Sequence, residues 1–339
     1  MIKNRVLVAD YGDWLSSDFA EFLKNHGRNV VLRNNIQMCP LLRGLRGFFW
    51  IFGKERILLD LRRLIEFGCM DFYLCFVLLF YRPTTLIVFK GQCLLTPLIA
   101  RAVGVRITLV FGSLPILSDR WVLCSKPKIW HYIENAQQKI AHIVVCESTF
   151  IAKLLKHDNV SVVHTFMDPR QIVKHPRCFS RDIGERPKVL FVGDDERKGA
   201  ECFAKSCDGI DFSRVEVVAI SDHLAVKDCK KISMAPRMKR EKFLEYLNEI
   251  DSIVTPTAGD GGPRIIFEAL WRGKSVISSH YCAATDLSDN PLVTLTSLNP
   301  IDIATAINSF QREPQIIVAG LQKLRNSVTR QQRLLLRSL

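Results

Sequence analysis

Two acidic residues stand eight positions apart in a glycine-rich segment. Residues 255–279 read TPTAGDGGPRIIFEALWRGKSVISS, with Asp260 in the glycine-rich part and Glu268 in the apolar part that follows. This order predicts a strand, a loop, a helix that begins near Pro263 and a second strand, because proline is favoured in the first turn of a helix. Unpaired backbone N–H groups at such a loop and helix start bind anions or sugar hydroxyls. Asp260 and Glu268 would add hydrogen-bond acceptors.

Two adjacent basic residues follow a glycine in a second segment. Residues 188–206 read KVLFVGDDERKGAECFAKS, which predicts a strand, a turn at Gly193 and a helix. Arg197 and Lys198 would project from the turn. A guanidinium fork and a compact ammonium group both suit a diphosphate, although basic residues at a helix start are often only solvent-facing.

The two acidic residues of that turn, Asp194 and Asp195, are expected to point away from the phosphates or to pair with the basic residues. They are explained as part of the turn. The sequence has no Asp-x-Asp constellation, and its eleven cysteines show no metal-like spacing. No metal ion is therefore expected.

Short β-branched runs alternate along the chain with longer amphipathic segments, which is typical of βαβ units on a parallel sheet. The predicted strands are residues 5–9, 30–32, 86–89, 107–110, 143–146, 160–164, 188–192, 215–220, 253–255 and 275–278. A polar, proline-containing stretch interrupts this pattern after the sixth strand. We expect an α/β protein with two similar Rossmann-like domains that face each other across a central cleft, where ligands of open α/β sheets bind.

The interruption defines the expected domain boundaries. Residues 1–170 form the first domain, residues 171–187 the linker and residues 188–315 the second domain. Residues 316–339 read as a basic helix that could pack back across both domains.

The segments around Asp260 and Gly193 resemble those of the retaining GT-B glycosyltransferases, most closely glycosyltransferase family 4 (group 1). Glu268, with the glycine at 273 and the strand after it, matches the second acidic residue of the family signature. Asp260 stands where the family commonly has Glu, and Phe111 stands where many members carry a His that approaches the donor sugar. Either another side chain supplies that contact, or the donor is handled differently, or activity is reduced.

The resemblance implies roles for the residues that match. Glu268 would hydrogen-bond the ribose hydroxyls of a nucleotide sugar, and Asp260 with the backbone of Gly261 and Gly262 would hold the donor sugar. Gly12, after the first strand, would line the cleft or serve as a plain turn residue. The first domain would bind the acceptor, and no cofactor beyond the nucleotide-sugar co-substrate is implied.

Residues 41–68 combine basic and aromatic side chains. Arg43, Arg46, Trp50 and Arg56 would suit the headgroup layer of an anionic membrane or a lipid-linked acceptor. An amphipathic helix pair packed on the sheet explains the same pattern, and periodicity does not separate the two.

The formal net charge is +13, which suits a polyanionic partner but does not choose among nucleic acid, anionic lipid and a phosphorylated substrate. Nucleic acid is not expected as the partner, and a steep salt dependence of DNA binding would revive that reading. No signal peptide or membrane-spanning run is apparent, so a cytoplasmic protein, peripheral on the inner membrane face at most, is expected.

The function expected from the sequence is metal-independent, retaining transfer of a sugar from a nucleoside diphosphate sugar to a saccharide or lipid-linked saccharide, in surface polysaccharide, lipopolysaccharide or glycolipid synthesis. Arg197, Lys198 and Asp260 would be the catalytic residues. The alternative is a non-catalytic GT-B protein that binds nucleotide sugars or anionic polymers as a scaffold. A sugar-nucleotide epimerase or a phosphorylase of the same fold is a third reading.

Overall fold

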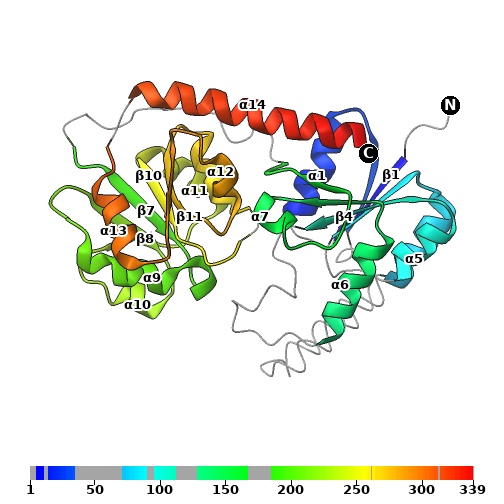
Figure 1. The fold of residues 1–339 in the computed structure, drawn as a ribbon, viewed down its shortest axis with the longest axis horizontal. Coiled ribbons are helices and arrows are strands. Elements are labelled where there is room, and N and C mark those ends of the chain that lie inside the picture. Colours follow the sequence, from blue (N-terminus) through cyan, green and yellow to red (C-terminus); the bar gives the residue numbers. More distant parts are fainter. Residues whose placement is uncertain are drawn as a thin grey trace.

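The computed structural model describes residues 5–10, 14–34, 71–89, 95–111, 128–166, 185–260, 262–311 and 314–338. Two sheets organise these residues, one built from the first half of the chain and one from the second (Figure 1).

The first sheet has six parallel strands in the order β2-β1-β3-β4-β5-β6. Its strands are β1 (Arg5–Asp10), β2 (Asn29–Asn34), β3 (Thr85–Phe89), β4 (Arg106–Phe111), β5 (Ile143–Cys146) and β6 (Val160–Val162). Its helices include α1 (Trp14–Asn25), helical residues 71–81, α5 (Leu95–Ala102), α6 (Lys128–Ile140) and α7 (Thr149–Ala152).

The second sheet has six parallel strands in the order β12-β11-β10-β7-β8-β9. Its strands are β7 (Lys188–Val192), β8 (Glu216–Ile220), β9 (Ser233–Met234), β10 (Ser252–Thr255), β11 (Ser275–Ser279) and β12 (Val293–Thr296). Its α-helices are α9 (Ala200–Ser206), α10 (Leu224–Lys227), α11 (Arg240–Tyr246), α12 (Arg264–Leu270) and α13 (Pro300–Asn308). Four 3-10 turns complete it: η2 (Glu196–Lys198), η3 (Cys207–Gly209), η4 (Leu247–Glu249) and η5 (Ala283–Leu287).

Both faces of each sheet are buried. On β1, Leu7 packs into the core on one face and Val8 into the core on the other, and neither side chain is exposed to solvent. Leu190 and Phe191 divide in the same way on β7. Parallel strands covered on two sides need apolar residues at consecutive positions, which explains the continuous apolar runs of the sequence.

The long helix α14 (Pro314–Ser338) crosses the outer side of both halves (Figure 1). In the second half, Asn290 donates its Nδ2–H to the carbonyl oxygen of Gly320 at 2.9 Å. In the first half, the backbone N–H of His164 donates to the Gln331 side chain at 3.1 Å. The helix is therefore attached to both sheets' domains. No described helix is long and apolar enough to span a bilayer.

Candidate functional site

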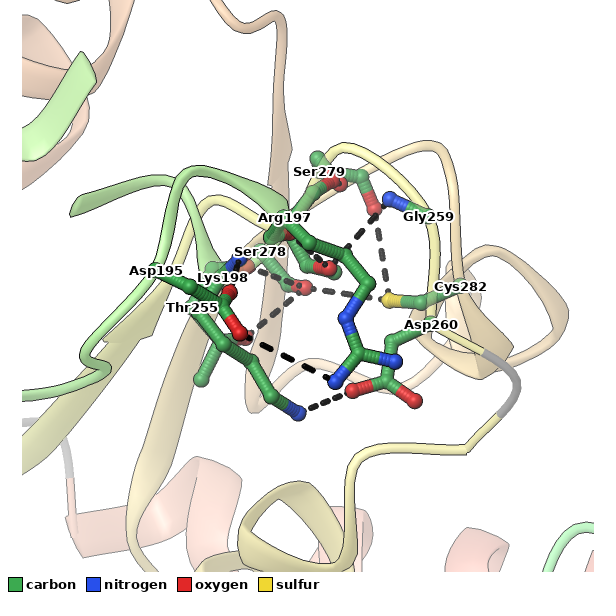
Figure 2. A network of polar contacts seen from close by, with 10 residues as sticks. Asp195, Arg197, Lys198, Thr255, Gly259, Asp260, Ser278, Ser279 and Cys282 are labelled. Carbon is green, nitrogen blue, oxygen red and sulfur yellow. Dashed lines mark hydrogen bonds and ion pairs between the residues drawn. The ribbon is translucent and has the colours of Figure 1, made fainter. Parts of the chain in front are cut away.

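The loops after β7 and β10 lie together because these two strands are neighbours at the point where the strand order reverses. The carbonyl oxygen of Arg197, in η2, accepts two hydrogen bonds from the loop after β10. One comes from the backbone N–H of Ala258 and the other from the hydroxyl of Thr257, each at 2.8 Å. These bonds hold the two segments singled out by the sequence as one unit (Figure 2).

Two glycines permit this close approach. Gly199 has a φ of 77°, and a Cβ atom there would lie 1.9 Å from the carbonyl oxygen of Pro256. A Cβ atom at Gly193 would lie 2.8 Å from Cβ of Lys198. A side chain at 199 would therefore displace the backbone of the β10 loop, whereas a side chain at 193 would displace Lys198 itself.

Lys198 and Asp260 form an ion pair within this unit. Asp260 is nearly buried, at 8% exposure, and the Lys198 side chain is one-third exposed. Asp195 fixes the start of η2, since its Oδ1 accepts from the backbone N–H of Lys198 at 2.8 Å. Figure 2 shows Arg197 and Lys198 extending from η2 on the side where Asp260 lies. The guanidinium of Arg197 lies 4.0 Å from the carboxylate of Asp195.

A layer of small polar side chains supports the β10 loop from β11. The Ser279 hydroxyl donates to the carbonyl oxygen of Thr257, and the hydroxyls of Thr255 and Ser278 lie 2.9 Å apart. The thiol of Cys282 lies 3.3 Å from the Ser278 hydroxyl, and burial raises the pKa of this thiol to about 11. The thiol is therefore neutral at physiological pH and supports the loop as a packed polar group.

Glu268 is buried in α12, with 5% exposure. Its Oε1 lies 3.0 Å from a guanidinium nitrogen of Arg240 and 3.2 Å from Nε of Arg264. Burial raises the pKa of the Glu268 carboxyl, and the nearby arginines oppose that rise. Glu268, which we predict to accept hydrogen bonds from the ribose, is thus held by two arginines, and the sequence analysis identified neither of them.

Arg264 also connects the two halves of the chain. Its Nη2 lies 3.1 Å from the carboxylate of Asp18, which belongs to α1 beside the first sheet. Both side chains are mostly buried, at 18% and 15% exposure. The helix that carries Glu268 is therefore attached directly to the first half.

The β5–α7 connection makes a second contact between the halves. A Cβ atom at Gly262 would lie 3.0 Å from Cβ of Glu147, so only glycine fits without a shift. Two residues on, the backbone N–H of Thr149 donates to the Asp286 carboxylate, in η5, at 2.7 Å. His164 lies at the same contact, where its Nδ1–H donates to the Glu147 carbonyl oxygen at 3.0 Å.

The structure places the remaining sequence-predicted residues as follows. Phe111 is fully buried in the first sheet's core, so its side chain offers no polar contact. Asp194 pairs at 2.6 Å with Arg237, which the sequence analysis did not single out, and not with Arg197 or Lys198. Outside the described residues lie Gly12, Arg43, Arg46, Trp50, Arg56 and Gly261. Among the residues that are described, no three His, Cys, Asp or Glu side chains gather as a metal site would require.

No family model matches the sequence, and no curated protein sequence matches it. Solved structures do match over nearly the whole chain. Sucrose-phosphate synthase from Thermosynechococcus elongatus is 13% identical, with a TM-score of 0.66 over 99% of this chain and 98% of that one. The trehalose-6-phosphate structure from E. coli bound with UDP-2-fluoro glucose is 10% identical, with a TM-score of 0.66 over 98% of both chains.

A third match is a putative UDP-N-acetylglucosamine 2-epimerase from Listeria monocytogenes. It is 10% identical, with a TM-score of 0.59 over 94% of this chain and 91% of that one. Identities this low establish the fold alone. The fold is the α/β arrangement of two Rossmann-like domains that sequence analysis predicted, known as GT-B.

Proposed function

We propose that this protein is a glycosyltransferase that moves a sugar from a nucleoside diphosphate sugar to a saccharide or lipid-linked saccharide. The observation that carries the proposal is the contact between Lys198 and Asp260, which pairs a cation and an acceptor at the edge of the sheet where ligands of this architecture bind. Two of the matched structures support the same chemistry. One is named sucrose-phosphate synthase, and the other is described as bound with UDP-2-fluoro glucose.

In this proposal Arg197 and Lys198 stabilise the negative charge that develops on the leaving diphosphate. When the donor binds, the Lys198 ammonium shifts from Asp260 toward the phosphates, and the released carboxylate accepts from hydroxyls of the donor sugar. Glu268 accepts from the ribose hydroxyls, which compete with Arg240 for its Oε1. The acceptor hydroxyl attacks the anomeric carbon from the face of the leaving diphosphate as the sugar–diphosphate bond breaks, so the configuration is retained. The leaving phosphate takes the acceptor proton, so the proposal needs no protein base and no metal ion.

The acceptor occupies the first domain, and residues 41–68 with Arg43, Arg46, Trp50 and Arg56 would bring it to the cytoplasmic face of the membrane. Membership of glycosyltransferase family 4 and a role in surface polysaccharide or glycolipid synthesis are part of the same proposal.

Two observations favour a second candidate, a non-catalytic nucleotide-sugar binder. Phe111 offers no polar group at the position where many members of the family that the sequence resembles carry a His that approaches the donor sugar. Asp260 stands where the same family commonly has Glu. In this candidate the donor binds and no group is transferred. Epimerases among the fold matches make donor isomerisation a third outcome to be measured.

The experiment is a turnover assay with a panel of UDP-, GDP-, ADP- and CMP-sugars, with and without saccharide acceptors. Nucleotide release and the donor's NMR spectrum are followed together. Acceptor-dependent release with a product of unchanged anomeric configuration supports the transferase. An isomerised donor without acceptor identifies an epimerase, and donor binding with neither change identifies the scaffold.

Lys198→Gln and its neighbour Lys205→Gln form a matched pair. Loss of a charge stabiliser at the leaving group reduces kcat by about 10²–10³-fold, so Lys198→Gln should fall by that factor. Among the described residues, Lys205 forms its ion pair with the exposed Glu201 on its own helix, and its variant should keep wild-type activity. Equal activities of the two variants would refute the role of Lys198.

A further inference from the structure

The outward face of α14 is strongly basic. The helix has 25 residues, PQIIVAGLQKLRNSVTRQQRLLLRS, and contains no acidic residue. Its buried side chains, among them Leu324, Val328 and Leu335, recur at helical spacing and point toward the protein. The basic residues fall on the opposite side of the helix.

Four arginines form a continuous stripe on that side: Arg325, Arg330, Arg333 and Arg337. Steps of five, three and four residues keep them within less than half the helix circumference, and they span about 18 Å along the axis. All four are exposed. Within the part of the chain that the structure describes, none of the four forms an ion pair.

The stripe borders two hollows. One is an open depression on the surface of α14 itself, formed by the four arginines together with Asn326, Thr329 and Leu334. A second, of about 880 Å³, lies between α14, the edge strand β6 and η5, and shares Asn326, Arg330 and Leu334 with the first. Asp286 and Asp289 also line the second hollow, so a phosphate would approach the guanidinium groups from the first.

An apolar side chain stands within this basic surface. Leu334 is 53% exposed and lies at the edge of the stripe next to Arg330, between Arg333 and Arg337 along the helix axis. Val318, nearer the start of the helix, is 74% exposed. Exposed apolar residues among arginines contribute nothing to binding a nucleic-acid backbone, but they enter the acyl boundary of a bilayer while the arginines contact headgroup phosphates.

We propose that this face of α14, defined by Arg325, Arg330, Leu334, Arg333 and Arg337, docks the protein on an anionic lipid surface. The helix lies on the outside of both domains, so contact along its length needs no change in the fold (Figure 1). This surface is separate from residues 41–68, and its role does not depend on glycosyl transfer.

The test is cosedimentation of the full-length protein with mixed phosphatidylglycerol–phosphatidylcholine vesicles and with pure phosphatidylcholine vesicles. Binding to the mixed vesicles alone, weakened by salt, is expected. Replacing the four arginines with Gln should weaken partitioning by about a hundredfold or more. The matched control replaces four exposed lysines on other elements, Lys24, Lys153, Lys230 and Lys242, with Gln and removes the same charge.

Leu334→Ser distinguishes a lipid surface from any other polyanion. It should weaken vesicle binding and leave binding to a single-stranded oligonucleotide unchanged. Circular dichroism and melting temperature establish that each variant is folded. Vesicle binding that survives the four-arginine change, or that falls equally in the lysine control, overturns the proposal. So does oligonucleotide binding in the absence of vesicle binding. Replacing Arg43, Arg46 and Arg56 instead reports on residues 41–68 separately.

Discussion

Arg264 and Asp18 form an ion pair of 3.1 Å that joins the helix carrying Glu268 to the helix that follows the first strand of the chain. The same guanidinium contacts Glu268 through Nε at 3.2 Å. One side chain thus connects the candidate donor site to the other domain. Any movement of α12 relative to the first half must stretch or break one of these contacts.

Removing the charge of Asp18 should destabilise the protein. Asp18→Asn removes one of the carboxylates that contact the mostly buried Arg264, and we expect the free energy of unfolding to fall by about 1–3 kcal/mol. Denaturant unfolding measures the change. The Asp18→Asn/Arg264→Gln double variant should lose less than the sum of the single variants, because the two residues share one interaction. Strict additivity would show that the pair contributes nothing.

Gly199→Ala should cost more stability than Gly104→Ala. Both glycines have a φ of 77°, and a left-handed conformation costs a non-glycine residue about 1–2 kcal/mol. A Cβ atom at Gly104 meets no atom within 4 Å, whereas one at Gly199 lies 1.9 Å from the Pro256 carbonyl oxygen. Chemical denaturation of the two variants isolates the cost of the close contact. Equal losses would mean that the two loops do not meet as described.

The pH dependence of stability should reveal the burial of Glu268. Its pKa is raised in the folded protein by burial, so the folded state holds this proton more tightly than the unfolded chain does. The contribution of Glu268 is therefore largest below its ordinary pKa and declines as the pH rises through the folded value. Unfolding of wild type and Glu268→Gln between about pH 4 and pH 8 measures it. A wild-type advantage that grows with pH would mean that Arg240 and Arg264 outweigh burial.

The central strands could be predicted because they are apolar at consecutive positions. The predicted run of residues 86–89 lies within β3, and residues 188–192 coincide with β7. The two edge strands of the second sheet were missed. β9 consists of two exposed residues, and β12 has the half-buried sequence VTLT, so neither shows a continuous apolar run.

The site could be predicted only where its residues are near in sequence or carry a motif. Glycine turns and acidic spacing identified Lys198, Asp260 and Glu268, but their contacts depend on how the β7 and β10 loops pack. Arg240 contacts Glu268, and Asp18 contacts Arg264. Each comes from a distant segment of the chain, and the sequence around it carries no motif that indicates the contact. Ser278 and Ser279, which support the β10 loop, do have a local signal in the sequence, because these two consecutive hydroxyl residues end β11 beside the glycine-rich loop.

Donor binding at Lys198 tests the central claim most directly. The melting temperatures of wild type, Lys198→Gln and the control Lys205→Gln are measured with UDP-, GDP-, ADP- and CMP-sugars, because a ligand that binds the folded state raises this temperature by mass action. The account predicts that sugars of one nucleotide class stabilise wild type and Lys205→Gln, and that this shift is lost in Lys198→Gln. No shift with any sugar, or the same shift in Lys198→Gln, would contradict it.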